Sequence, residues 1–294
     1  MPLSKTIRQR LGNVARAAPS LKHTAKERMQ EMGAGEPNPA DPKTQYLWMR
    51  RTARQEGRPW RAAYAWSVLQ AARSAHGLGL ERVSALEFGV AGGTGLLALE
   101  TAAEHAERLT GVGIDVFGFD TGGGLPAPTD PRDVPFLLKE GDYPMDQSLL
   151  RSRLQRAELV LGLVKDTVPK FLEEERAPVG FVSNDLDFYS STMESFQILD
   201  AHPDRVLPRV FSYFDDVTLY PWTDFNGERA AIAEFNATRE NRKISHVYGL
   251  RWWLPGADMK ALWPEKIFVA ELFDHPLYGA PEGVPGVQQL TLGL

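Results

Sequence analysis

The fold of this chain of 294 residues is decided by the stretch SALEFGVAGGTG at residues 84–95. Its apolar run ends at Gly89, four glycines lie within residues 89–95, and the helix-forming run LLALE follows at residues 96–100. This order predicts a buried strand, a glycine-rich turn and the start of a helix. Glycine lets the backbone approach a ligand closely, and the first N–H groups of a helix can bind an anionic or polar group. The stretch therefore predicts a cradle for a nucleotide.

Glu87 separates two candidate ligands for this cradle. It lies two residues before the turn, where its carboxylate can pair with an ammonium group, and this favours S-adenosylmethionine (SAM), whose amino acid tail is cationic at one end. The alternative is a dinucleotide, because residues 93–98 also fit G-x-G-x-x-A and acidic residues follow at Asp115 and Asp120. The first glycine of that fingerprint should follow the strand directly, but Gly93 lies four residues beyond Gly89. The register favours SAM.

Composition indicates an ordinary soluble globular protein. Hydrophobic residues make up 43% of the chain and charged residues 24%, and the formal net charge of -5 gives no general footprint for nucleic acid. The absence of cysteine excludes a disulfide framework, a thiolate nucleophile and a zinc site with cysteine ligands. Since no apolar run approaches a membrane span and no signal peptide is evident, a cytoplasmic protein is expected.

The chain is expected to divide into one α/β domain with extensions. A homo-oligomer is expected, and the first segment could contact a membrane surface, a partner or another subunit, because Leu3, Ile7, Leu11 and Val14 recur at helical spacing among basic residues. The expected boundaries are a basic N-terminal arm and linker at 1–40, a helical cap at 41–80, a SAM-binding domain at 81–275 and a C-terminal tail at 276–294.

Strand and helix patterns alternate after residue 84, which predicts a Rossmann-like α/β fold. The alternation implies a mostly parallel sheet with helices on both faces. Two further apolar stretches close to the C-terminus are expected to form an antiparallel hairpin that completes seven strands. Beyond the first strand, the expected strands are 111–120, 158–164, 179–182, 209–214, 247–255 and 266–273.

Acidic residues follow the predicted strands at the edge where ligands bind in open parallel sheets. Asp120 ends the second strand, where a carboxylate can hold a ribose diol. Asp185 follows the fourth strand, and Asp215 and Asp216 follow the fifth. Unpaired carboxylates in one pocket repel one another, and Mg²⁺ removes that repulsion because it prefers oxygen ligands. Asp187 is expected to cap the helix that begins near residue 189, and the lack of histidine argues against zinc or iron.

Six motifs, taken in order, resemble the macrocin O-methyltransferase family. Members of that family are class I SAM-dependent enzymes that methylate sugar hydroxyls of natural products with Mg²⁺. The resemblance covers roughly residues 84 to 236. The motifs are EFGVAGG at 87–93, GFDT at 118–121 with GLP at 124–126, KDTVP at 165–169, DLDFYSST at 185–192, DD at 215–216 and GERAAIAEF at 227–235.

The resemblance implies a role for each matching position. Asp185, Asp215 and Asp216 would bind Mg²⁺, which would chelate two neighbouring hydroxyls of the substrate. Asp185 is the expected base that takes the hydroxyl proton, and Asp187 is the second candidate. The methionine part of SAM would lie near Glu87, Gly89 and Gly93, its ribose at Asp120, and its adenine near Asp166 and Thr167. The expected cofactor-binding residues are thus Glu87, Gly89, Val90, Ala91, Gly93, Asp120, Thr121, Asp166 and Thr167.

Three other functions compete with O-methylation. An oxidoreductase dependent on NAD(P) would need a site such as Tyr-x-x-x-Lys, and none lies near the strand ends. A hydroxylase on the same scaffold would need a redox metal and at least one histidine ligand. A SAM-binding protein without catalysis would not need the acidic residues Asp185, Asp215 and Asp216.

Overall fold

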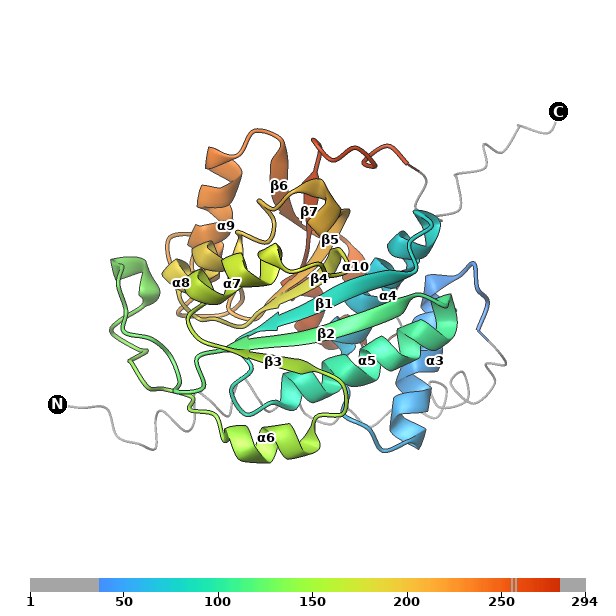
Figure 1. The fold of residues 1–294 in the computed structure, drawn as a ribbon, viewed down its shortest axis with the longest axis horizontal. Helices are drawn as coiled ribbons and strands as arrows, with labels where there is room; N and C mark the ends of the chain where they lie inside the picture. The colour runs from blue at the N-terminus through green and yellow to red at the C-terminus, as the bar shows by residue number, and fades with distance from the viewer. Residues whose placement is uncertain (1–36, 255, 257, 281–294) are drawn as a thin grey trace.

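The computed structural model describes residues 37–254, 256 and 258–280, which form a seven-stranded sheet between two layers of helices (Figure 1). The strand order is β3-β2-β1-β4-β5-β7-β6. Strands β1 to β5 run parallel to one another, and β7 is antiparallel to both β5 and β6. The strands are β1 Arg82–Phe88, β2 Gly113–Asp120, β3 Glu158–Leu161, β4 Val179–Asn184, β5 Val206–Phe214, β6 Arg242–His246 and β7 Ile267–Leu272.

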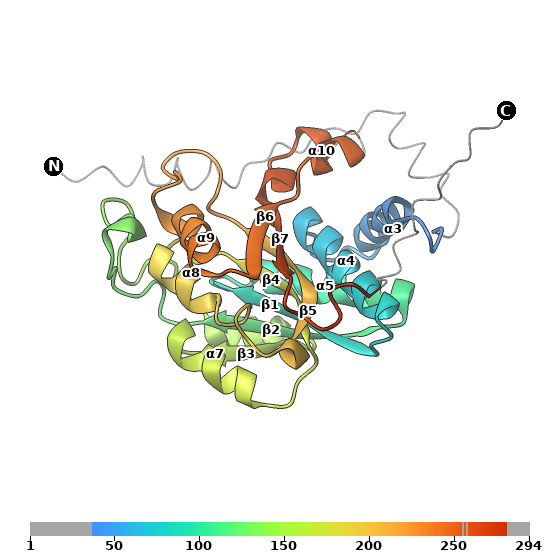
Figure 2. The same cartoon turned by 90° about the horizontal axis from the view of Figure 1, so that it is seen from above.

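Helices cover both faces of the sheet (Figures 1 and 2). On one face α4 and α5 pack against the strands and α3 packs on α4 and α5, whereas α7, α8 and α9 cover the other face. The α-helices are α3 Pro42–Gln55, α4 Ala62–Gly77, α5 Thr94–Thr110, α6 Gln147–Arg153, α7 Val164–Glu173, α8 Tyr189–Ser195, α9 Gly227–Thr238 and α10 Leu250–Trp253. Short 3-10 turns are η1 Pro131–Asp133, η2 Pro203–Arg205, η3 Asp258–Lys260 and η4 Trp263–Lys266.

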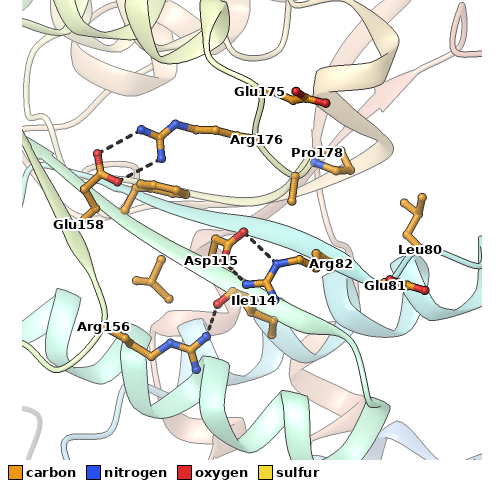
Figure 3. Close-up of a pocket in the computed structure, with 13 residues that line it drawn as sticks. Leu80, Glu81, Arg82, Ile114, Asp115, Arg156, Glu158, Glu175, Arg176 and Pro178 are labelled. Carbon is orange, nitrogen blue, oxygen red and sulfur yellow. Dashed lines mark hydrogen bonds and ion pairs between the residues drawn. The ribbon is translucent and has the colours of Figure 1, made fainter.

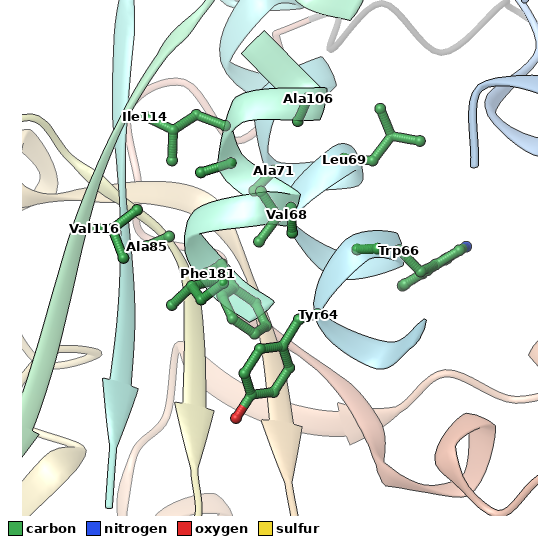
Figure 4. Packing of buried hydrophobic residues seen from close by; sticks show 14 of the residues in the cluster. Tyr64, Trp66, Val68, Leu69, Ala71, Ala85, Ala106, Ile114, Val116 and Phe181 are labelled. Carbon is green, nitrogen blue, oxygen red and sulfur yellow. The ribbon is translucent and has the colours of Figure 1, made fainter. Parts of the chain in front are cut away.

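Each face of the sheet has its own apolar core, because the central strands are buried on both sides. Figure 4 shows the core under α4, where Val68 and Ala71 face Ala85 of β1 and Phe181 of β4. In β1 every residue after Arg82 is buried. Continuous burial of this kind is typical of strands in parallel sheets that are covered by helices on both faces. The cap expected at residues 41–80 therefore includes a helix of the main core.

The strand order changes direction at one defined point of the sheet. From β1 the chain continues to β2 and β3 on one side, and it then returns to β4 on the opposite side of β1. In open α/β sheets ligands bind outside the carboxyl ends of the strands at such a switch point. In this chain the point lies beyond the ends of β1 and β4.

The α/β fold with a mostly parallel sheet of seven strands is confirmed, but the positions of the last strands differ. The strand expected at 247–255 is wrong, because β6 lies at Arg242–His246. Gly249 has a positive φ of 79° and begins the short helix α10, so the chain cannot continue as a strand there. β3 ends at Leu161, three residues early, since Gly162 adopts a φ of 141°.

Two expectations concern parts of the chain that the structure does not describe. The expected amphipathic segment with Leu3, Ile7, Leu11 and Val14 lies outside the described residues, as does most of the expected tail at 276–294. Within the described part of the chain, no helix combines the length and apolarity needed to cross a membrane.

Candidate functional site

The turn from β1 to α5 forms a tight loop that Asp120 holds in place. Oδ2 of Asp120 accepts hydrogen bonds from the backbone N–H groups of Val90 at 3.0 Å and Ala91 at 2.9 Å, and Oδ1 accepts one from Gly122 at 2.6 Å. Gly93, with a φ of 78°, is the N-cap of α5, and no side chain among the described residues caps this helix end. The first N–H groups of α5 are therefore available to a ligand.

Gly89 joins this loop to the end of β4. Its φ is 84°, and a Cβ atom at this position would lie 1.9 Å from the backbone oxygen of Asp185. No other residue fits at this position without displacing one of the two strands. The residue after β1 and the first acidic residue after β4 are consequently in direct backbone contact.

Glu87 is a buried carboxylate with one oxygen free. Glu87 is only 1% exposed, and its Oε1 accepts a hydrogen bond from the hydroxyl of Tyr64 at 2.7 Å. Figure 4 shows this hydroxyl pointing away from the apolar core, at the carboxyl ends of the strands. The phenol oxygen also lies 2.8 Å from Oγ of Ser183, which therefore donates to it, because the single phenol proton is used toward Glu87. Oε2 of Glu87 has no hydrogen-bond partner among the described residues.

Glu87 lies directly against the first turn of α5, where Gly95 leaves space for its carboxylate. A Cβ atom on Gly95 would lie 1.8 Å from Oε1, so the glycine is required for the carboxylate to occupy its place. Burial raises the pKa of Glu87 to about 7, although the positive charge of Arg61 opposes this. A ligand with an ammonium group would supply the partner that Oε2 lacks and favour the ionised form.

The raised pKa of Glu87 predicts a defined pH dependence of stability. Because the folded protein binds this proton more tightly than the unfolded chain, the contribution of the neutral carboxyl is complete below about pH 4.5 and is lost as the pH rises through about 7. Relative to Glu87→Gln, the free energy of unfolding of the wild type should fall by up to about 3 kcal/mol over this range. Urea unfolding of both proteins from pH 4.5 to 8.5 measures the difference, and parallel curves would contradict the assignment.

Three carboxylates meet beyond the ends of β4 and β5. One carboxylate oxygen from each of Asp185, Asp215 and Asp216 lies within 4.8 Å of the others. Asp216 is 9% exposed, and its Oδ2 has no hydrogen-bond partner among the described residues. Burial, together with neighbouring carboxylates, raises the pKa of Asp185 and Asp216 well above its usual range. An all-oxygen group with an unpartnered buried atom fits a hard divalent cation.

Glu228 is a fourth buried carboxylate at this site. It lies in the first turn of α9 with 0% exposure, and it accepts hydrogen bonds from the backbone N–H groups of Asp216 at 2.9 Å and Leu186 at 3.4 Å. Its pKa is raised well above its usual range by burial, with the charges of Asp185 and Asp215 adding to the effect. Glu228 thus fixes the backbone of the two loops that carry the acidic cluster.

The expected capping role of Asp187 is wrong. The N-cap of α8 is Phe188, and within the described ranges no side chain caps the helix. Asp187 instead adopts a left-handed conformation with a φ of 60°, and its side chain lies close enough to Asp216 to interact with it. Burial raises the pKa of Asp187 to about 7, and its interaction with Asp216 opposes the shift. The structure therefore adds Asp187 to the acidic cluster rather than to the helix end.

Two basic side chains lie beside the acidic cluster: Lys266 at the end of η4 and Arg61 at the N-cap of α4. Nζ of Lys266 lies 2.9 Å from Oδ1 of Asp215, which also accepts a hydrogen bond from Tyr213. Nη1 of Arg61 lies 3.8 Å from Oδ2 of Asp185. Burial opposes ionisation of Asp215, but the charge of Lys266 and the hydrogen bond from Tyr213 lower its pKa overall.

The remaining predicted ligand residues lie at the same edge of the sheet. Asp166 and Thr167 are in the first turn of α7, where Asp166 is exposed and the hydroxyl of Thr167 donates to the backbone oxygen of Leu163 at 3.0 Å. The hydroxyl of Thr121 is used within its own turn, where it donates to the backbone oxygen of Gly124. The loop geometry accounts for Thr121 without a ligand.

Four residues at the site were missed by sequence reasoning. Glu228 stands in a quoted motif, and Tyr64 lies in an aromatic helical segment, so both carried a weak signal. Arg61 and Lys266 carried none, because their proximity to the acidic cluster depends on how distant segments pack. These residues are Arg61, Tyr64, Glu228 and Lys266.

An open groove of about 840 Å³ lies at the opposite edge of the sheet, next to the start of β1 (Figure 3). None of the predicted site residues lines it. Arg176 pairs with Glu158 at 3.1 Å and Arg82 pairs with Asp115, while Arg156 contacts the backbone oxygen of Ile114. The groove therefore offers no excess of positive charge for an anionic ligand, and Asp115 has the structural role that its place within the strand suggests.

Comparison with known proteins gives only remote likenesses. No protein-family model matches the chain, and no curated protein matches it. Among solved structures, the O-methyltransferase NovP is 17% identical with a TM-score of 0.45, over 60% of this chain and 72% of that one. The calicheamicin methyltransferase CalS11 is 19% identical with a TM-score of 0.48, over 85% and 91% of the two chains. An O-methyltransferase from Bacillus cereus in complex with SAH is 14% identical with a TM-score of 0.40, over 84% and 96%. At these identities and scores, the likenesses assign no activity to this chain.

Proposed function

We propose that the protein is an enzyme that transfers the methyl group of SAM to a hydroxyl of a small molecule, with Mg²⁺ bound beside the cofactor. The observation that carries the proposal is the buried Oε2 of Glu87 within a glycine cradle, which has no hydrogen-bond partner in the part of the chain that the structure describes. A pyrophosphate would be repelled by this carboxylate, whereas the ammonium group of SAM would pair with it. The resemblance to the macrocin O-methyltransferase family supports a sugar of a natural product as the acceptor.

The cradle residues account for binding of the methyl donor. Glu87 would accept the ammonium group, and the uncapped N–H groups of α5 would face the polar end of the amino acid tail. Asp120 already accepts three backbone hydrogen bonds, but a carboxylate has about four acceptor sites, which leaves one for a ribose hydroxyl. Asp166 and Thr167 would lie near the adenine.

The acidic cluster accounts for the chemistry at the acceptor. Asp185, Asp215 and Asp216 would hold Mg²⁺, and the metal supplies a positive charge that orients and polarises hydroxyl groups when bound. Asp185 would take the proton of the acceptor hydroxyl while the new bond from oxygen to the methyl carbon forms and the bond from sulfur to that carbon breaks. Asp187 is the second candidate for this base.

A methyl-transfer assay tests the proposed function. The purified protein is incubated with SAM labelled in its methyl group and with a panel of sugars and catechol-like compounds that carry neighbouring hydroxyls. We expect label to appear in at least one compound of the panel, and chelation of divalent cations with EDTA should abolish the transfer. Transfer that persists in EDTA would contradict the role of the metal. Oxidation of an acceptor with NAD(P) would instead support the oxidoreductase alternative.

A further inference from the structure

We infer that Lys266 is a tethered cation that competes with the divalent metal for Asp215, so that it neutralises the acidic cluster in the metal-free protein and weakens metal binding. The inference rests on the proposed metal site and concerns how that site is regulated. It is carried by the ion pair between Lys266 and Asp215, in which Nζ lies 2.9 Å from Oδ1.

The sheet places Lys266 at the cluster independently of any ligand. In the antiparallel pairing of β5 with β7, Tyr213 lies opposite Ile267. Lys266 immediately precedes Ile267, so it reaches the end of β5 where Asp215 begins the loop. Its side chain is 16% exposed, which shows that the amine is held within the site rather than extended into solvent.

Lys266 takes up acceptor capacity that a metal would need. The amine of Lys266 and the hydroxyl of Tyr213 both contact the same oxygen, Oδ1 of Asp215. The other basic neighbour differs, because Arg61 lies 3.8 Å from Asp185, beyond hydrogen-bond distance. Lys266 is therefore the basic side chain that is directly bonded to a member of the predicted metal trio in the described part of the chain.

The negative charge of the acidic cluster explains why a lysine at position 266 would be favourable. Five carboxylates gather at this edge, and burial disfavours all of them in the ionised form unless positive charge is near. A lysine beside the cluster reduces the repulsion when no metal is bound. The same positive charge repels an incoming dication, since like charges at close range are unfavourable. The five carboxylates are Asp185, Asp187, Asp215, Asp216 and Glu228.

The test is a calorimetric titration of the full chain with MnCl₂ in the absence of SAM. Lys266→Met removes the charge and keeps most of the side-chain volume, and Lys266→Arg keeps the charge. Lys170→Met, at an exposed position on α7, removes one positive charge away from the site. We expect Lys266→Met to bind Mn²⁺ at least about fivefold more tightly than the wild type, and the other two variants to stay within about twofold. The melting temperature of Lys266→Met in EDTA should be lower than that of the wild type.

The outcomes separate competition from a merely structural role. If Lys266 only anchors η4 to the sheet, Lys266→Met will bind Mn²⁺ no more tightly than the wild type, and the inference is overturned. If neither protein binds Mn²⁺, the metal site itself fails together with the inference. A parallel titration with SAM then shows whether the cofactor half of the proposed function still stands.

Discussion

Replacement of Glu87 by glutamine is expected to weaken SAM binding at least about 100-fold at pH 8, because the amide keeps the shape but cannot neutralise a buried ammonium group. Oε2 of Glu87 has no other partner among the described residues, so the substitution would remove the carboxylate that the ammonium group pairs with. Isothermal titration with SAM measures the effect.

Glu81→Gln is the matched control, since Glu81 is exposed just before the opposite end of the same strand. It should bind SAM like the wild type. Thermal unfolding of Glu87→Gln must show a folded protein, and we expect it to be at least as stable as the wild type above pH 7. If folded Glu87→Gln binds SAM within about threefold of the wild type, Glu87 does not pair with the ammonium group.

Replacement of Asp185 by asparagine is expected to lower kcat for methyl transfer at least about 1000-fold, because the change removes both a metal ligand and the expected base. SAM affinity should stay within about threefold of the wild type, since Asp185 contacts the cradle through its backbone oxygen, which the substitution preserves. Single-turnover kinetics together with SAM titration separate the two effects.

Asp115→Asn is the control for Asp185→Asn, because it also removes one carboxylate from the same sheet but at a position away from the site. Asp115 pairs with Arg82 at the far edge, so its loss should leave kcat unchanged. An equal loss of SAM affinity and of turnover in Asp185→Asn would mean that Asp185 acts by supporting the cradle. The division of roles between cradle and acidic cluster would then be wrong.

The glycine cradle could be predicted from sequence because the residues that determine it are close together in the chain. The strand, the glycine turn and the start of α5 lie within residues 84–100, and hydrophobic pattern and glycine spacing specify them directly. The positions of Asp185, Asp215 and Asp216 followed from the same logic, since each comes directly after a buried strand. The parallel sheet brings those strand ends together without further information from the sequence.

The parts that could not be predicted depend on contacts between distant segments. Tyr64 and Glu87 are 23 positions apart, and Lys266 and Asp215 are 51 positions apart. Their pairing depends on how α4 and β7 pack on the sheet, and single-sequence periodicity does not encode such pairings. The spacing of Asp187 predicts a helix cap, but its left-handed conformation turns the side chain toward Asp216.

The last strands show how composition can mislead at a sheet edge. Residues 247–255 are rich in aromatic side chains, and this pattern predicts a strand, yet Tyr248 and Trp252 are 84% and 75% exposed. The actual strand β6 is polar, and Ile244 is its one buried residue. An edge strand that buries a single side chain has little hydrophobic pattern, so the sequence pattern favours the aromatic segment next to it.

Isothermal titration of the purified protein with SAM and separately with NADH, each with and without Mg²⁺, tests the central claim most directly. The buried carboxylate in the glycine cradle predicts SAM binding in roughly the micromolar range and no binding of NADH. Binding of NADH without SAM would contradict the account, because the glycines at 93 and 95 would then hold a pyrophosphate and the methyl-transfer proposal would have to be withdrawn.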